Sequence, residues 1–174
     1  TEITEYINRI TALEEEIDVL QSKKLVLYDN GTSNMSFESY PLKTSHTRGT
    51  EVLSGDFLRI FITSNNNSVM SRIGTTDTID LTDYKTIYID WEIERDHVID
   101  LTYHGLEIST SKVFDNGKIG YLAYSAGNAC SGGGRRIETL NLANINTNVY
   151  ISIFTSAYGY NSQGIKIYKI WIEK

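Results

Sequence analysis

Along the first 24 residues, apolar positions recur in steps that alternate between three and four residues. This is the heptad spacing of a coiled-coil seam. The seam positions are Ile3, Tyr6, Ile10, Leu13, Ile17 and Leu20. The pattern predicts a helix about 33 Å long, which is too short and too charged to span a membrane. We therefore expect residues 1–24 to form a coiled-coil stem, because a lone helix leaves its apolar stripe uncovered.

Two charged residues beside the seam indicate how many copies the stem contains. Arg9 precedes the seam residue Ile10, and Glu14 follows Leu13, an arrangement that resembles the trimerisation motif of short parallel coiled coils. In that motif the Arg guanidinium pairs with the Glu of the neighbouring helix. Isoleucine at a positions with leucine at d positions favours two strands instead. We expect a homotrimer, with a dimer and a helix folded back onto its own domain as the alternatives.

The period of the pattern changes to two after the stem. In residues 86–94 four apolar side chains alternate with polar ones without exception, as in a half-buried antiparallel strand. Residues 115–117, Asp-Asn-Gly, are typical of a hairpin turn. Residues 165–173 are apolar on both faces in their second half, so they predict a central strand or one that meets a neighbouring subunit. Roughly ten such strands and no second helix predict an all-β head over residues 25–174, a jelly-roll-like β-sandwich.

Composition and charge narrow the range of functions. The chain has 174 residues, 40% of them hydrophobic, a net charge of -6 and a pI of about 5.1. An acidic chain is a poor partner for nucleic acid, because phosphate binding needs a basic surface. Cys130 is the single cysteine, which excludes an intrachain disulfide. We find no signal peptide or membrane-spanning run and expect no membrane insertion. A start at Thr1 suggests a fragment of a longer protein.

Three segments of the head carry a resemblance to a known group of proteins. Residues 25–31, 79–89 and 167–173 resemble the C-terminal heads of tail-fibre and baseplate receptor-binding proteins from phages and prophages of Gram-positive bacteria. The resemblance implies a homotrimeric virion protein, made in the cytoplasm of the bacterial host and extracellular in the tail. It also implies that the head binds a host cell-surface glycan or cell-wall polymer. No catalytic residue is implied, because the matched segments are strands and turns.

Three carboxylates share one face of the strand over residues 86–94. Asp90, Glu92 and Glu94 follow one another at two-residue steps of roughly 6.6 to 6.8 Å. Such a separation suits the paired carboxylates of a glycoside hydrolase. A solvated strand face is the simpler interpretation of the same pattern.

Other residues with catalytic or metal-binding chemistry do not form a motif. The three histidines are scattered along the chain: His46, His97 and His104. We expect His97 and His104 to lie at the surface. Three nearby aspartates could hold calcium, but they lack a calcium-loop pattern: Asp77, Asp80 and Asp83. We expect no metal and no cofactor.

Sugar binding requires aromatic faces and planar hydrogen-bonding groups, which loops at one end of a sandwich can provide. The segment over residues 156–164 and the glycine-rich segment over residues 127–136 combine these groups. The predicted glycan contacts are Tyr158, Tyr160, Asn161, Gln163, Arg135 and Arg136. The arginines could also hold a phosphate or carboxylate of a cell-wall polymer. The alternative is that the tyrosines pack at a trimer interface and the arginines meet acidic neighbours.

Three functions are compatible with these patterns. We favour a non-catalytic trimeric head that binds host carbohydrate. The alternatives are a purely structural trimerisation domain of a fibre or baseplate, and a glycan depolymerase. Binding to a glycan array separates the first two, and release of reducing ends from host polysaccharide would indicate the third.

Overall fold

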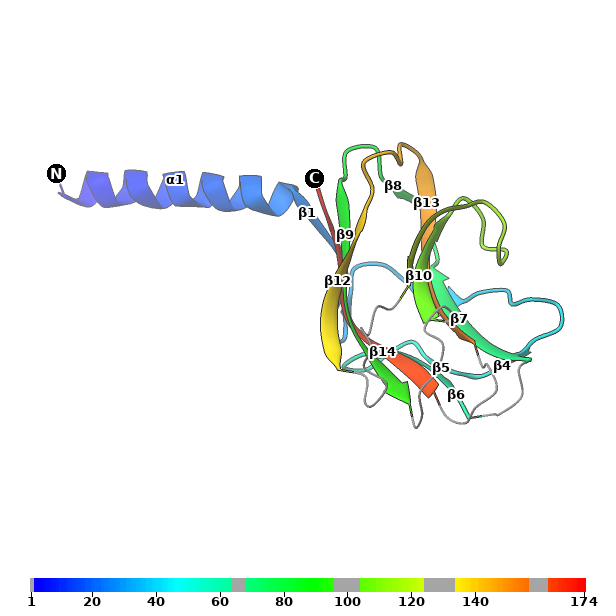
Figure 1. Ribbon diagram of the computed structural model, residues 1–174. Helices are drawn as coiled ribbons and strands as arrows, with labels where there is room; N and C mark the ends of the chain where they lie inside the picture. Colours follow the sequence, from blue (N-terminus) through cyan, green and yellow to red (C-terminus); the bar gives the residue numbers. More distant parts are fainter. Residues whose placement is uncertain (1, 64–67, 96–103, 124–133, 157–162) are drawn as a thin grey trace.

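A computed structural model describes residues 2–63, 68–95, 104–123, 134–156 and 163–174. Helix α1 (Glu2–Ser22) projects away from a β-sandwich and meets it at strand β1 (Lys24–Asp29), as Figure 1 shows. The six seam side chains are 50% to 72% exposed, so the described part of the chain does not cover them. The predicted helix is confirmed, and the alternative of a helix folded back onto its own domain is wrong. The coiled coil and the trimer stay predictions.

The first of two seven-stranded sheets, sheet A, is organised around β14 (Gln163–Glu173). Strand β9 (Thr86–Arg95) pairs with β14 along one side. On the other side β6 (Leu58–Ile62) pairs with the first half of β14, and β1 pairs with the second half. The remaining strands are β12 (Arg135–Asn141), β2 (Thr32–Ser33) and β5 (Thr50–Val52). The final apolar run of the sequence is therefore a central strand.

Sheet B lies against sheet A and closes the sandwich (Figure 1). Its main path runs β11 (Lys118–Ala123), β10 (His104–Ser109), β13 (Asn148–Ser156), β7 (Val69–Thr75) and β3 (Phe37–Ser39). Two short strands, β4 (Thr47–Arg48) and β8 (Ile79–Asp80), pair with β7 and β13.

The strand order is that of a jelly roll. Sheet A contains the order β6-β14-β9-β12, and sheet B contains β7-β13-β10-β11. Among these eight strands, each one crosses to the other sheet from the one before it in the chain, except at the β10–β11 hairpin. The prediction of a β-sandwich with jelly-roll-like order is confirmed.

The core fills the space between the two sheets. The four apolar side chains of β9 that alternate with polar ones, Ile87, Ile89, Trp91 and Ile93, are at most 2% exposed. Burying side chains of this size stabilises the fold by about 1.5 to 3 kcal/mol each. The polar residues between them must then face away from the core, which creates the outer surface of sheet A.

The predicted hairpin is confirmed, with a longer connection than expected, and one local prediction is wrong. The β10–β11 hairpin forms, but β10 ends at Ser109 and the positive φ angles fall at Asp115 (58°) and Gly117 (68°), so the connection is wider than a two-residue Asn-Gly turn. His104 is fully buried instead of lying at the surface, and its Nδ1 is 2.6 Å from Thr155 Oγ1. His97 lies outside the described residues.

Candidate functional site on the outer face of sheet A

The outer face of sheet A presents aromatic rings and charged groups side by side. These side chains are half-buried or exposed, apart from Trp171, which is 9% exposed. The surface is defined by Tyr88, Asp90, Glu92 and Glu94 on β9; Lys166, Tyr168, Lys169 and Trp171 on β14; Arg135, Ile137 and Thr139 on β12; and Arg59 and Phe61 on β6.

The centre of this face is a cluster of four side chains from three strands. Arg135 donates two hydrogen bonds to Asp90, from Nε at 2.9 Å and from Nη2 at 2.8 Å. The same guanidinium lies 3.8 Å from the ring centroid of Tyr168. The Tyr168 hydroxyl donates to Glu92 Oε2 at 2.6 Å. Each polar group is thus held in one orientation by its neighbours.

Burial and hydrogen bonding shift the pKa values of two members of this cluster. Burial, followed by the hydrogen bond to Glu92, raises the pKa of Tyr168 to about 12. The hydrogen bond to Asp90 raises the pKa of Arg135 above its ordinary value. At neutral pH the tyrosine therefore remains a donor and the arginine remains charged.

A second ion-pair group lies beside this cluster. Arg59 donates to both oxygens of Glu94, at 2.7 and 3.3 Å, and Lys166 Nζ lies 3.3 Å from Glu94 Oε1. The Arg59 guanidinium also lies 4.3 Å from the ring centroid of Phe61. The three carboxylates of β9 are therefore engaged with arginine, lysine or tyrosine partners and do not stand as a free catalytic pair.

Toward the helix, the outer face carries an aromatic pair. The rings of Tyr88 and Trp171 stack with centroids 4.9 Å apart and planes at 5°. Lys24 Nζ lies 4.8 Å from the Trp171 ring centroid, and Trp171 Nε1 donates to Glu173 at 2.9 Å. Thr139, the cross-strand neighbour of Tyr88 on edge strand β12, is small and exposed.

On sheet B, in contrast to sheet A, outward-pointing side chains are buried by other parts of the chain. The salt bridge between Arg72 and Glu107, at 2.7 Å, has side chains only 0% and 1% exposed. Arg72 Nη1 also donates to the backbone oxygen of Lys112 at 2.6 Å, and its guanidinium packs near the rings of Tyr40 and Phe114. The connection between β10 and β11 thus covers this face, whereas the described outward side chains of sheet A are half-buried or exposed, apart from Trp171.

The residues predicted as glycan contacts are placed differently from expectation. Arg135 and Arg136 belong to strand β12, not to a loop, and consecutive strand residues point to opposite faces. Only Arg135 reaches the outer face. Gln163 is 2% exposed and donates to the Ser156 backbone oxygen at 2.6 Å, so it is not a surface loop residue. The other three predicted contacts lie outside the described residues and stay predictions: Tyr158, Tyr160 and Asn161.

Sequence reasoning missed the aromatic members of the outer face. Tyr88 and Trp171 contact each other because β9 and β14 pair in a register that sets them opposite. The alternation over residues 86–94 did indicate that Tyr88 points outward. Its partner could be found only from the strand register, which the sequence pattern does not contain.

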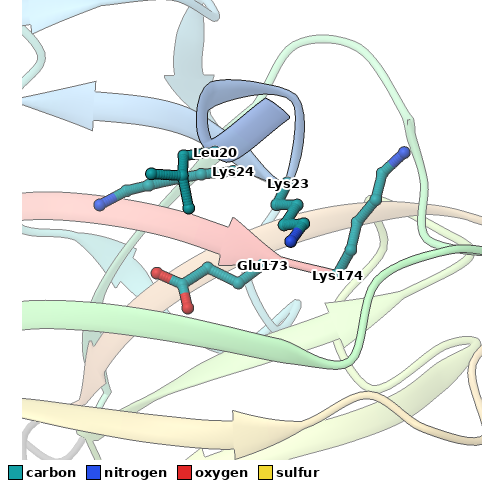
Figure 2. A pocket seen from close by; sticks show the side chains of 5 residues that line it. All are labelled: Leu20, Lys23, Lys24, Glu173 and Lys174. Atoms are coloured by element: carbon teal, nitrogen blue, oxygen red, sulfur yellow. The ribbon is translucent and has the colours of Figure 1, made fainter. Parts of the chain in front are cut away.

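A hollow of about 240 Å³ lies where the helix joins the sandwich. It is lined by Leu20, Lys23, Lys24, Glu173 and Lys174. Figure 2 shows that the three lysine amino groups point in different directions, so they do not converge on one ligand. The Lys174 backbone nitrogen donates to the Lys23 oxygen at 2.9 Å, which ties the chain end to the helix base. We interpret this hollow as a structural joint.

Across the described ranges no group of three or more His, Cys, Asp or Glu side chains is arranged to hold a metal ion. The three aspartates considered for calcium include Asp80, whose Oδ1 instead accepts hydrogen bonds from the Thr82 backbone nitrogen at 3.0 Å and hydroxyl at 2.6 Å. Helix α1, the helix in the described part of the chain, lacks the apolar length needed to cross a membrane.

Comparisons with known proteins establish the fold. No protein-family model and no curated protein matches the chain. Among solved structures, a family 29 carbohydrate-binding module from Piromyces equi matches with a TM-score of 0.51 and 9% identity, over 87% of this chain and 90% of that chain. An arginine-to-alanine variant of the module CBM29-2 matches with a TM-score of 0.51 and 12% identity, over 87% and 91%.

A third similar structure contains a ligand. A lysine-to-alanine variant of CBM29-2 complexed with cellulohexaose matches with a TM-score of 0.50 and 10% identity, over 86% of this chain and 89% of that chain. At these identities the similarity shows a shared β-sandwich fold. What the chain binds must be argued from its own residues.

Proposed function

We propose that the sandwich is a non-catalytic head that binds carbohydrate on the outer face of sheet A. The observation that carries the proposal is the joint presence of a stacked aromatic pair and a fixed polar cluster on one sheet face. The similarity of the fold to carbohydrate-binding modules supports the same class of ligand.

The aromatic pair supplies an apolar contact for a sugar. Pyranose rings present C–H faces that pack against aromatic side chains. Tyr88 and Trp171 hold each other in place by stacking, so little rotamer freedom is lost when a sugar binds. The exposed Thr139 beside Tyr88 leaves access for a ring from the edge of the sheet.

The polar cluster supplies directional hydrogen bonds for hydroxyl groups. A guanidinium has five N–H groups, and the two bonds to Asp90 use two of those on Arg135. Asp90 and Glu92 carry further acceptor positions on their carboxylates. The ion pair fixes these groups before a ligand binds. The entropy cost of ordering them is therefore part of the folding free energy and does not weaken binding.

The stem would bring several heads together in one particle. A single shallow site of this kind binds weakly, and three heads on one coiled coil would raise avidity by roughly 10² to 10⁴. The uncovered seam of α1 and the Arg9–Glu14 spacing support three copies. The resemblance of three head segments to receptor-binding proteins of phage tails supports a role in attachment to a bacterial surface, as part of an extracellular virion structure.

A glycan array probed with the full chain tests the carbohydrate claim, and titration of the strongest ligand tests the site. Arg135→Ala is expected to weaken binding at least about tenfold, because it removes charged hydrogen-bond donors. Arg48→Ala is the matched control on sheet B. Its side chain is 40% exposed and ion-paired, against 49% for Arg135. An array with no bound glycan contradicts the function, whereas equal loss or no loss in both variants contradicts the site.

A further inference from the structure

The tripeptide Asp-Asn-Gly occurs twice in the chain, at residues 29–31 and at residues 115–117. Both asparagines, Asn30 and Asn116, are exposed. An asparagine followed by glycine can lose its side-chain amide without an enzyme, because the glycine nitrogen has no side chain beside it to hinder attack on the asparagine side-chain carbonyl. The two copies share this intrinsic reactivity, so a difference between them in the folded chain must come from the structure.

The first copy is a tight turn that hydrogen bonds hold in place. Asn30 and Gly31 form the two-residue turn between β1 and β2, with φ angles of 42° and 93°. The Gly31 nitrogen donates to the buried Tyr28 hydroxyl at 3.0 Å, and that hydroxyl donates to the Gly55 oxygen at 2.9 Å. Asn30 Nδ2 donates to Asp29 Oδ1 at 2.7 Å. Both reacting groups, the Gly31 nitrogen and the Asn30 amide, are therefore already engaged.

The second copy lies in the longer connection between β10 and β11. The Thr110 nitrogen donates to the Gly117 oxygen at 2.9 Å, and the Asn116 backbone nitrogen donates to the Val113 oxygen at 3.2 Å. Across the described ranges, no group accepts a hydrogen bond from the Gly117 nitrogen or from the Asn116 side-chain amide. No hydrogen bond of either reacting group must therefore break before the Gly117 nitrogen approaches the Asn116 side chain.

We propose that Asn116 is a site of spontaneous deamidation and that the fold protects Asn30 from the same reaction. The Gly117 nitrogen loses its proton to solvent base and bonds to Cγ of Asn116, and the side-chain nitrogen takes up a proton and leaves as ammonia. Solvent water then opens the five-membered imide that results. Opening on one side gives aspartate, and opening on the other gives isoaspartate, whose main chain is one carbon longer.

The modification would change a connection that already carries charge. Lys118 Nζ lies 3.1 Å from Asp115 and 4.0 Å from Glu107, the buried partner of Arg72. A new carboxylate beside Asp115 would compete with Glu107 for Lys118, and the longer main chain of isoaspartate would alter the connection that covers Arg72. This connection lies on sheet B, so the proposal is independent of the candidate carbohydrate site on sheet A.

Peptide mapping by mass spectrometry tests the proposal on the folded full chain, incubated in mildly alkaline buffer. Trypsin releases Asn116 within residues 113–118 and Asn30 within residues 25–43, where fragment ions distinguish Asn30 from Asn34. The acid form of Asn116 should accumulate at least about tenfold faster than that of Asn30, because attack at Asn30 must first break the hydrogen bonds of both reacting groups. Equal rates, or a faster rate at Asn30, overturn the proposal.

The same chain unfolded in urea is the matched control. There both asparagines should convert at similar rates, so a slower rate at Asn30 in urea would show that the fold is not what protects it. An Asn116 that converts only in urea would overturn its assignment as a modification site of the folded chain.

Tyr28→Phe tests the source of the protection. It removes the acceptor of the Gly31 nitrogen and should speed conversion at Asn30, with the rate at Asn116 as the internal reference. The thermal unfolding midpoint shows whether the variant is folded. Undiminished protection of Asn30 in the folded variant would contradict the role of the Tyr28 hydroxyl.

Discussion

Arg135 reaches across a neighbouring strand to cover the ring of Tyr168. The guanidinium carbon lies 3.8 Å from the ring centroid. These residues sit on β12 and β14, which are separated by β9 in the sheet. Arg135 also holds Asp90 on β9, so one side chain joins three strands of sheet A. The candidate site therefore depends on the register of all three strands.

The first prediction concerns the ionisation of Tyr168. Its pKa is raised to about 12 by burial and by the hydrogen bond to Glu92, against an ordinary value of 10.0. Glu92→Gln is expected to lower this pKa, because it removes a nearby negative charge. An NMR pH titration of the Tyr168 ring measures the midpoint in both proteins. A Tyr168 midpoint that is not lower in Glu92→Gln than in the wild type would contradict the hydrogen bond between Tyr168 and Glu92.

The same shift has a defined effect on stability. The folded state keeps the Tyr168 proton to a higher pH than the unfolded state. The stabilisation linked to this group is therefore fully present below about pH 10 and is lost as the pH rises from about 10 to 12. Urea denaturation across this range should show a smaller loss of unfolding free energy for Glu92→Gln than for the wild type.

The buried salt bridge on sheet B should matter more for stability than the exposed one on sheet A. Glu107→Gln leaves the fully buried Arg72 without its charged partner, so we expect a loss of about 3 to 5 kcal/mol in unfolding free energy. Asp90→Asn disrupts the ion pair to Arg135, which is 49% exposed, and should cost under about 1 kcal/mol. Urea denaturation of both variants tests this order, and similar losses would show it to be wrong.

The seam of the helix should control assembly without controlling the fold of the head. Ile10 and Ile17 are 56% and 50% exposed in the single chain. Replacing both with Asp is expected to abolish the trimeric mass in light scattering, because charges in the seam are costly to bury. The thermal unfolding midpoint of the sandwich should change little. Glu15→Ala, on the far side of the helix, is the control and should keep the wild-type mass. An unchanged mass in the double variant would show that the seam does not hold the copies together.

The sequence pattern predicted the parts of the fold that have a regular period. The heptads predicted α1, and the strict alternation over residues 86–94 predicted β9 with its buried and outward faces. Strand β7 was missed. Its buried residues include Arg72 and Gly74, so the strand has no apolar alternation to detect. An alternation of apolar and polar residues indicates a strand only where the buried residues of that strand are also apolar.

The candidate site was harder to predict, because its members meet through pairing between distant strands. Arg135 was predicted as a glycan contact in a loop, since three glycines immediately precede it, but it lies on strand β12. The burial of His104 was missed, because it depends on pairing with β13, where the hydrogen-bond partner Thr155 is remote in sequence. The stack of Tyr88 on Trp171 depends on the β9–β14 register. No local pattern records these contacts.

Tryptophan fluorescence during glycan titration tests the location of the carbohydrate site most directly. The two tryptophans lie on opposite faces of sheet A: Trp91 is 0% exposed in the core, and Trp171 lies on the outer face. The glycan selected on the array should change the emission of the wild-type full chain. In Trp171→Phe that change should disappear, while array binding persists at reduced strength. An emission change of wild-type size in Trp171→Phe would contradict a site on the outer face of sheet A.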